Sequence, residues 1–368
     1  MKLGFGLMRL PIINNDDKQI DMEQFCNMVD DFIAAGGTYF DTAYIYHGGN
    51  SETVFKEAVV KRYDRDSFTI ADKMPMFIIK EESQLEKIFN EQLQRCGVEY
   101  FDYYLLHSLN EKFIETVERI GAVDFVLKKK EQGYIKKVGF SFHDTAEVLD
   151  DFLTKHPEME FVQLQINYLD YETDDIQSRK CYETAIKHKK PVIVMEPIKG
   201  GLLANLPAEV EKILKERDEK ASMASWAIRF AASLENVRMV LSGMSTKQQM
   251  EDNLSYMKNF KTLTEEEKQL ILEVGETIKN NTAIACTKCR YCENNCPMGL
   301  AISDYFEVYN NYYRYGRNDL KRAKRNYRWV TKEKAKASEC ISCGACEEAC
   351  PQHLEIRNLL AQVAKEFE

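Results

Sequence analysis

Cys286-Thr-Lys-Cys289-Arg-Tyr-Cys292-Glu-Asn-Asn-Cys296-Pro297 is the stretch that decides how the last part of this chain folds. The same spacing returns as Cys340-Ile-Ser-Cys343-Gly-Ala-Cys346-Glu-Glu-Ala-Cys350-Pro351. This spacing with a trailing proline is typical of thiolates that hold [4Fe–4S] cubes, three from one run and the fourth from the other. We therefore expect two crossed ligand sets: Cys286, Cys289, Cys292 and Cys350 on one cluster, and Cys340, Cys343, Cys346 and Cys296 on the other.

Disulfides and structural zinc are the alternatives for these cysteines. The first residues, Met1-Lys2-Leu3-Gly4-Phe5-Gly6, run directly into an expected strand and do not read as a signal peptide, so an oxidising compartment is not indicated. Zinc sites usually pair two short cysteine knuckles, or one knuckle with histidines, and this spacing fits them poorly. The doubled run therefore favours two iron–sulfur clusters in a reducing, cytoplasmic location.

The length and charge of the chain limit what it can be. Its 368 residues suit one large domain and one small domain. No stretch approaches the roughly 18 uninterrupted apolar residues of a membrane span, so no membrane association is expected. Residues 1–280 carry a net charge of −12, whereas residues 281–368 carry +3, with ten basic side chains between residues 311 and 338. An acidic body does not favour nucleic acid as a partner.

Short β-branched and aromatic runs alternate with amphipathic segments along most of the chain. The expected strands are Lys2–Leu7, Thr38–Asp41, Phe68–Asp72, Tyr103–Leu106, Lys136–Phe140, Phe161–Ile166, Val192–Met195 and Arg238–Leu241. The expected helices are Met22–Ala35, Glu52–Arg62, Ser83–Cys96, Glu111–Glu131, Thr145–Lys155, Ser178–Lys189, Ala221–Ser233 and Thr246–Lys258. This alternation predicts an α/β fold, a (β/α)8 barrel. A doubly wound sheet is the alternative, but no G-x-G-x-x-G fingerprint opens a first helix.

The expected domain limits follow from these patterns. We expect the barrel over residues 1–262, a connecting helix over 263–280, and a small, mainly helical dicluster domain over 281–368. Within the connecting helix, the amphipathic segment Glu265–Lys279 would span about 22 Å as a helix, roughly the height of a barrel. It would either return the chain to the carboxyl ends of the strands or seal the opposite end, and the sequence leaves both open. Tyr305, Tyr309, Tyr312 and Tyr313 recur at helical spacing and predict aromatic packing near the clusters.

Four polar residues stand where successive expected strands end, which is where a barrel carries its catalytic groups. Asp41 ends the second strand, Tyr46 follows in its loop, Lys73 ends the third and His107 ends the fourth. Alone, each has a structural explanation, such as a cap, a half-buried ring or a hydrogen-bonded core residue. Together they predict hydride reduction of a carbonyl. Tyr46 would be the acid, Lys73 and Asp41 the pair that tunes it, and His107 the donor that orients the carbonyl oxygen.

With these residues in place, residues 1–260 resemble the aldo/keto reductases, which share the barrel and use an Asp, Tyr, Lys and His tetrad with NADPH. The resemblance extends to Leu3-Gly4-Phe5-Gly6, Val138-Gly139-Phe140-Ser141, Gln165-Ile166-Asn167-Tyr168, Pro197 with Gly200-Gly201, and Gly243 to Asn253. The cysteine runs are similar to those of bacterial ferredoxins. The chain therefore resembles the aldo/keto reductase subgroup with a C-terminal ferredoxin-type 2[4Fe–4S] domain, which implies an oxidoreductase.

The resemblance also implies a nicotinamide site contacted by Ser141, Gln165, Asn167, Gly243, Gln249 and Asn253. Three positions depart from the family pattern. Phe142 stands where an asparagine often follows the serine, and Met195 where a tyrosine often stacks on the nicotinamide. Gln249 stands where many members grip the 2′-phosphate of NADPH with an arginine, and glutamine cannot make that charged fork. NADP(H) and NAD(H) both remain open, with a flavin as the alternative cofactor.

Hydride transfer moves electrons in pairs, whereas a [4Fe–4S] cluster passes them singly, and three interpretations follow. The barrel reduces a small carbonyl substrate with a nicotinamide dinucleotide, beside clusters that carry electrons, regulate or stabilise. Alternatively, the chain is a ferredoxin- or flavin-linked reductase whose clusters feed the barrel, or a non-catalytic electron-transfer scaffold, against which the complete tetrad argues. Lys321-Arg322-Ala323-Lys324-Arg325 would steer an acidic electron carrier such as ferredoxin or flavodoxin, or is a solvated helix face.

Overall fold

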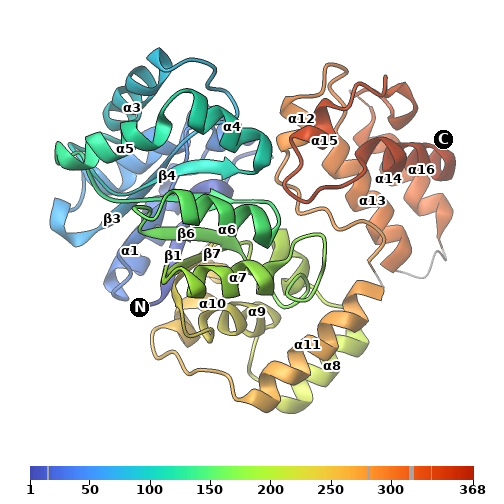
Figure 1. The fold of residues 1–368 in the computed structure, drawn as a ribbon. Coiled ribbons are helices and arrows are strands. Elements are labelled where there is room, and N and C mark those ends of the chain that lie inside the picture. The colour runs from blue at the N-terminus through green and yellow to red at the C-terminus, as the bar shows by residue number, and fades with distance from the viewer. Residues whose placement is uncertain (15, 281, 315–318, 333) are drawn as a thin grey trace. The chain divides into compact units, whose positions relative to one another are not determined.

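The barrel predicted from the sequence is present in the computed structural model, which describes residues 1–368 except 15, 281, 315–318 and 333. Figure 1 shows strands of this barrel with helices around them. The parallel strands pair in chain order, and β8 closes the ring against β1, where Leu3 pairs with Val240. The strands are β1 Leu3–Gly6, β2 Tyr39–Asp41, β3 Thr69–Met74, β4 Phe101–Leu109, β5 Ile135–Phe142, β6 Phe161–Gln165, β7 Val192–Met195 and β8 Val237–Ser242. The (β/α)8 fold is confirmed, and the doubly wound sheet is excluded.

The helices around the barrel follow the apolar pattern of the sequence. Helix α1, Met22–Ala34, buries Phe25, Met28, Val29 and Phe32 on one stripe, and the Asp21 side chain caps its first turn. The others are α2 Ser51–Phe55 with a π-turn over Lys56–Val60, α3 Ser83–Cys96, α4 Glu111–Arg119, α5 Ala122–Glu131, α6 Ala146–Lys155, α7 Ser178–Lys187, α9 Met223–Ala232 and α10 Lys247–Met257.

Two local features differ from the sequence-based expectation. The segment expected as one helix over Glu111–Glu131 is broken into α4 and α5 because Gly121 adopts a left-handed conformation, φ +66°. Helix α8, Ala208–Arg217, was not predicted at all. Its charged sequence, which buries only Val210 and Leu214, gives a weak helical signal.

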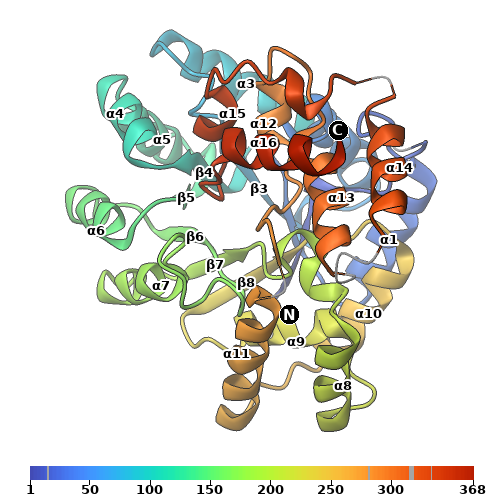
Figure 2. The same cartoon turned by 90° about the vertical axis from the view of Figure 1, so that its right-hand side faces the viewer.

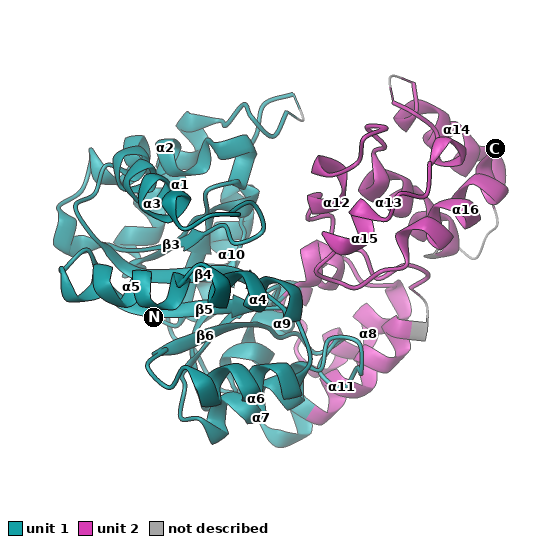
Figure 3. Ribbon diagram, turned by 45° about the horizontal axis from the view of Figure 1, so that its top comes forward, with its two compact units in different colours: residues 1–197, 224–268 teal, residues 198–223, 269–368 magenta. Residues whose placement is uncertain are grey.

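The chain forms two compact units (Figure 3). The first comprises Met1–Pro197 and Ala224–Lys268, and the second comprises Ile198–Met223 and Gln269–Glu368. Residues 198–223, which we expected to belong to the barrel domain, therefore group with the C-terminal residues. Helix α11, Glu265–Asn280, corresponds to the expected connecting helix.

The second unit is helical, as expected. Its C-terminal part contains α12 Tyr291–Asn294, α13 Ile302–Arg314, α14 Leu320–Val330, α15 Ala345–Glu348 and α16 Ile356–Phe367 (Figure 2). The expected aromatic packing is present, since Tyr305 and Tyr309 are buried in the core of this unit and Tyr312 and Tyr313 pack against it. Arg317, one of the ten basic residues counted between residues 311 and 338, lies outside the described residues. Among the described residues, no helix is both long and apolar enough to cross a membrane.

Candidate active site

The polar residues inside the barrel stand one layer above an apolar layer. That layer consists of buried residues from six of the eight strands, Tyr39, Ala71, Leu105, Phe161, Ile193 and Leu241. Side chains of a strand repeat their direction every second residue. The next inward positions are therefore Asp41 on β2, Lys73 on β3, His107 on β4, Gln163 on β6 and Met195 on β7. The barrel thus presents three of the four expected catalytic residues at one level.

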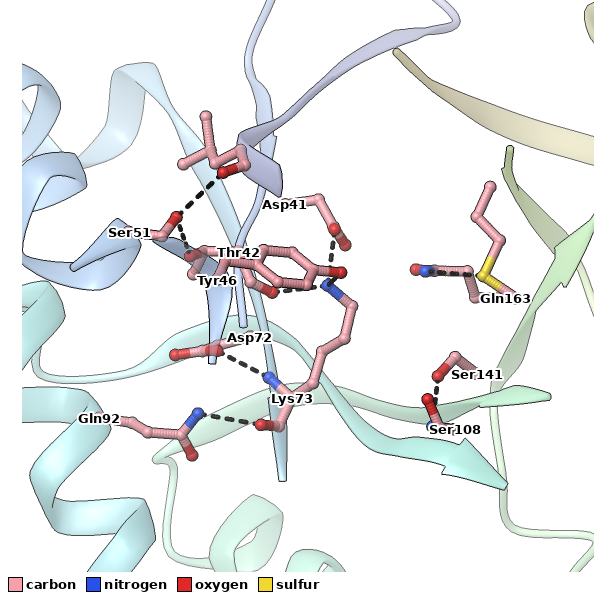
Figure 4. Close-up of polar contacts among 12 residues, drawn as sticks. Asp41, Thr42, Tyr46, Ser51, Asp72, Lys73, Gln92, Ser108, Ser141 and Gln163 are labelled. Atoms are coloured by element: carbon pink, nitrogen blue, oxygen red, sulfur yellow. Dashed lines mark hydrogen bonds and ion pairs between the residues drawn. The ribbon is translucent and has the colours of Figure 1, made fainter. Parts of the chain in front are cut away.

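Lys73 lies at the centre of the site (Figure 4). Its Nζ is 2.6 Å from Asp41 Oδ1, donates to the Thr42 carbonyl oxygen at 2.6 Å, and donates to the Tyr46 hydroxyl at 3.3 Å. The Lys73 side chain is fully buried, and Asp41 and Tyr46 are nearly so. A lysine is rarely buried unless its charge is paired, and here a carboxylate balances it. The arrangement places an ammonium directly beside a phenol hydroxyl.

Buried polar groups behind Lys73 hold its main chain. The Lys73 amide donates to Asp72 Oδ1 at 2.8 Å, and the Gln92 side chain donates to the Lys73 carbonyl oxygen at 3.0 Å. Thr42 and Ser51 share a 2.8 Å hydrogen bond between their hydroxyls, and Ser51 also donates to the Leu7 carbonyl oxygen. Asp72 and Gln92 could not be recognised from the sequence, because their roles depend on contacts between α3 and β3 rather than on spacing.

His107 is neutral in this environment. Burial, then the positive charge of Lys73 and the neighbouring His143, lower the pKa of His107 well below its ordinary value of 6.5. Its ring lies edge-on to the Tyr46 ring, with centroids 6.2 Å apart, and close to Phe77. No described group hydrogen-bonds the buried Nδ1 atom. Burial raises the pKa of Asp41, and its interactions with Lys73 lower it in part.

Three of the residues expected to contact a cofactor lie at the ends of β5 and β6. The Ser141 hydroxyl accepts a hydrogen bond from the Ser108 amide at 2.8 Å. Gln165 and Asn167 both donate to Asp170 Oδ2 at 2.8 Å. The Asn167 side-chain oxygen also accepts from the amides of Leu169 and Asp170, so this side chain holds the turn after β6.

The other three expected contacts lie at and after the end of β8. A Cβ atom on Gly243 would come within 3.2 Å of the Arg9 side chain. Asn253 is buried and donates to the Ser242 hydroxyl at 2.9 Å. Gln249 is exposed in the first turn of α10, where its side-chain oxygen accepts from the Ser245 amide at 2.7 Å. Gln249 therefore acts in part as a helix cap, which its position after Thr246 would have suggested.

Gln163 is a polar residue of the barrel that the sequence analysis missed. It is 2% exposed, its Nε2 lies 3.6 Å from Met195 Sδ, and no described group donates to its Oε1. A buried amide oxygen without a partner is costly unless a ligand or water satisfies it. Strand alternation from Gln165 would have found it, because both residues share the inward face of β6.

The eight cysteines of the two runs line two separate small cavities, four cysteines to each. Cys286, Cys289, Cys292 and Cys350 line one, which we call the first cluster site. Cys296, Cys340, Cys343 and Cys346 line the other, the second cluster site. Three cysteines in each set come from one run and the fourth from the other, which is the grouping expected from the sequence. None of the described cysteines forms a disulfide.

The duplicated sequence produces duplicated local structure around these sites. Lys288 and Ser342 both have φ +56°, and their amides donate to Cys286 Sγ and Cys340 Sγ, each at 3.4 Å. Glu293 accepts from the Ser303 amide at 2.9 Å, and Glu347 from the Arg357 amide at 2.8 Å. These carboxylates cap the first turns of α13 and α16, ten residues further along the chain in each case. The sequence analysis noted the cysteines but not these two glutamates.

Comparison with known proteins assigns the fold and site to a family. Residues 2–276 match the model of the aldo/keto reductase family, and residues 285–354 match that of the 4Fe-4S dicluster domain. The chain therefore belongs to the aldo/keto reductase family, is an oxidoreductase, and carries a 4Fe-4S dicluster domain at its C-terminus. The resemblance drawn from the sequence is confirmed.

The individual relatives are distant. An uncharacterized oxidoreductase of Bacillus subtilis, YqkF, is 21% identical over 72% of this chain and 90% of its own length. The NADH-specific methylglyoxal reductase of Escherichia coli is 25% identical over 55% of this chain, which spans 65% of that relative. Among solved structures, an aldo-keto reductase from Klebsiella pneumoniae in complex with NADPH matches with a TM-score of 0.58 and 18% identity, over 74% of this chain and 90% of that chain. The holo form of an aldo-keto reductase from Bacillus halodurans matches with a TM-score of 0.57 and 21% identity, over 74% of this chain and 91% of that chain.

Proposed function

We propose that the barrel reduces a small carbonyl compound with a nicotinamide dinucleotide and that the C-terminal domain carries two [4Fe–4S] clusters for electron transfer. The observation that carries the proposal is the contact of the buried Lys73 ammonium with both the Asp41 carboxylate and the Tyr46 hydroxyl. A phenol beside a fixed cation is an effective proton donor, because the cation stabilises the phenolate that remains after transfer.

The residues divide the work as follows. Tyr46 holds the proton at its hydroxyl oxygen, 3.3 Å from Lys73 Nζ. Asp41 and the Thr42 carbonyl oxygen fix the ammonium, so that it cannot swing away as charge develops on the phenol. His107, neutral and buried beside Tyr46, offers a ring nitrogen to the carbonyl oxygen of the substrate. Phe77, in contact with the His107 ring, helps to exclude water from that oxygen.

The barrel offers groups that suit a nicotinamide dinucleotide. When bound, such a cofactor supplies hydride. Gln163 Oε1, buried and without a described donor, suits the carboxamide of a nicotinamide ring, with Ser141 and Gln165 nearby on the same strand ends. The N-terminus of α10, at Gln249, suits a phosphate through its main-chain amides. Neither Gln249 nor Gly243 offers a positive charge to a 2′-phosphate. We therefore expect NADH and NADPH to bind with similar affinity.

The two cysteine-lined cavities fit iron–sulfur clusters, because each brings four thiols around one space. Cys343 and the neighbouring Ile341 are exposed, Ile341 by 58%, so the second cluster site is the more accessible to an external electron carrier. The position of the basic helix α14 relative to this site follows only indirectly, from its contact with α16. Tyr327 of α14 contacts Phe367 at the end of α16, about 15 Å along that helix from Arg357 at the second cluster site.

Anaerobically purified protein with a filled complement of clusters provides the test. We expect it to oxidise NADH and NADPH in the presence of a panel of small aldehydes and dicarbonyls, including methylglyoxal, the substrate named for the Escherichia coli relative. Mass analysis of the supernatant after denaturation should find no stoichiometric FMN or FAD. Failure to turn over any carbonyl with either dinucleotide would contradict the proposal.

A ferredoxin- or flavin-linked reductase is the second candidate function. It is favoured by Met195, which occupies the inward end of β7 where the resemblance led us to expect a tyrosine, and by the accessible second cluster site. In that case the denatured protein would release a flavin, and reduced ferredoxin or flavodoxin would support turnover that neither dinucleotide supports. The same turnover assay and supernatant analysis therefore separate the two functions.

A further inference from the structure

The loop Lys199–Ala204, which follows β7 in the chain, belongs to the same compact unit as the cysteine runs. It makes a close contact with the first of them. A Cβ atom on Gly200 would lie 2.2 Å from the carbonyl oxygen of Thr287, which stands between Cys286 and Cys289. No side chain fits at that distance. Glycine is therefore required for the loop to reach the first cluster site.

Lys199 reaches the same cavity from a second direction. Its side chain is 2% exposed, and its Nζ donates to Gln352 Oε1 at 3.3 Å. Gln352 follows Cys350 by two residues and lines the first cluster site together with the four cysteines. Lys199 also has φ +45°, a conformation that a residue with a side chain adopts at a cost of about 1–3 kcal/mol when the surrounding contacts enforce it. Adjacent residues of one loop thus contact the segments that follow Cys286 and Cys350.

These contacts place an ammonium one residue away from the first cluster site. Gln352 lines that site beside Cys350, and its side-chain oxygen accepts from Lys199. Hydrogen bonds to cluster sulfurs and nearby positive charge both favour the reduced form of an iron–sulfur cluster, because reduction adds negative charge. Burial of the ammonium strengthens this effect, since water screens it little.

We propose that Lys199, acting through Gln352, is a positioning residue that raises the reduction potential of the cluster in the first cluster site. The inference rests on the proposed ligand sets. Such a shift would favour the passage of one electron from the second cluster to the first, which would oxidise the second and reduce the first. The loop after β7 would thereby set the direction of electron flow between the two clusters.

Redox titration of the full-length, cluster-loaded protein, followed by EPR, tests the role of Lys199. Lys199→Met should lower the reduction equilibrium constant of one cluster at least tenfold, about 59 mV for a one-electron couple, and leave the other unchanged. Lys199→Arg should restore the potential. Lys212→Met is the matched control, because Lys212 belongs to the same unit on α8 and its side chain is 78% exposed. An unchanged potential in Lys199→Met, or an equal shift of both clusters, would overturn the proposal.

A second pair of variants tests the contact without removing the charge. Gly200→Ala must push the loop away from Thr287, so it should lower the same potential as Lys199→Met. Gly201→Ala is the control, since Gly201 also has a positive φ, but a Cβ there meets nothing within 4 Å. If Lys199→Met binds less iron than the wild type, Lys199→Gln and Lys199→Arg are compared instead. Equal reduction potentials of the first-site cluster in these two variants would overturn the proposal. Wild-type protein without clusters would instead refute the proposed ligand sets.

Discussion

Tyr46 is the residue on which the proposed chemistry depends most, and its environment isolates that role. Lys73 keeps the Asp41 carboxylate and the Thr42 carbonyl oxygen as partners whether or not the Tyr46 hydroxyl is present. Removal of that hydroxyl therefore leaves no unpaired buried ammonium. The substitution tests proton donation rather than stability.

Tyr46→Phe should reduce kcat for carbonyl reduction by about 10²–10⁴-fold, the usual contribution of a positioned acid. The affinity for the dinucleotide should change less than about twofold, because the ring and its packing remain. Stopped-flow turnover and a fluorescence titration with NADH would measure the two effects. Wild-type turnover in Tyr46→Phe would show that another group donates the proton.

His107 allows a prediction about pH. Burial, the charge of Lys73 and the neighbouring His143 lower its pKa well below 6.5, so we expect it to remain neutral in the range around pH 6.5 where an ordinary histidine becomes charged. We expect kcat/KM to show no ionisation of this residue in that range. The unfolded chain, in contrast, binds a proton at this histidine below pH 6.5, so His107 makes the folded state less stable as the pH falls.

His107→Gln is the variant that checks this assignment. It should raise the KM for the carbonyl substrate without changing the shape of the pH profile. A midpoint near 6.5 that is present in the wild type and disappears in His107→Gln would contradict a neutral His107.

Single residues also show how much of the candidate site could be predicted from the sequence. Asp41, Lys73 and His107 could be found because each stands at an inward position two residues after an apolar one, on three consecutive strands. The prediction placed Lys73 and His107 at strand ends, whereas β3 continues to Met74 and β4 to Leu109. Strand pairing, which depends on residues distant in the sequence, sets those ends. Asp72 and Gln92 could not be predicted for the same reason.

At the scale of elements, we expect the start of α10 to determine which dinucleotide the barrel prefers. Gln249→Arg would place a guanidinium where we expect the 2′-phosphate, and it should raise the affinity for NADPH relative to NADH at least tenfold, about 1.4 kcal/mol. Gln248→Arg adds the same charge to the neighbouring exposed residue and should change the ratio less. Competitive titration with both dinucleotides would measure the ratio of the two affinities in each variant. An equal effect of the two variants would indicate a general electrostatic attraction.

The caps of α13 and α16 give a second test of an element. Glu347→Ala and Glu293→Ala each remove the carboxylate that accepts from the first turn of a helix, and each should cost about 1 kcal/mol of stability. Glu347→Gln and Glu293→Gln retain an acceptor oxygen and should lose less. Thermal unfolding of the anaerobic, loaded protein would compare the four variants. A loss of stability in the variants of only one of the two glutamates would show that the caps of α13 and α16 are not equivalent.

At the scale of the whole molecule, two clusters should be present in each chain. We expect about eight iron and eight sulfide per chain, with an EPR signal after reduction. Cys350→Ser should remove or destabilise the cluster of the first site, although Cys350 lies in the second cysteine run. Iron analysis of the variant beside Cys343→Ser would show the two losses separately. A zinc-only protein after anaerobic reconstitution would refute the assignment.

The grouping of residues 198–223 with the C-terminal unit marks the limit of prediction at this scale. The barrel order and the doubled cysteine run are local or periodic patterns, and both could be read from the sequence. The pairing of Lys199 with Gln352 joins residues 153 positions apart and leaves no periodic trace. The glycines at 200 and 201 were noticed, but only as part of a family resemblance.

The crossed cysteine sets have a consequence for biosynthesis. On a ribosome, the first three expected ligands of the first cluster site are translated at Cys286, Cys289 and Cys292, but the fourth, Cys350, only 64 residues after Cys286. Cys296 likewise waits for the second run before its expected partners exist. With these ligand sets, a nascent chain offers no complete cluster site until Cys346 has been translated, and neither half of the domain can be finished on its own. We therefore expect iron to be delivered only after both cysteine runs have been translated.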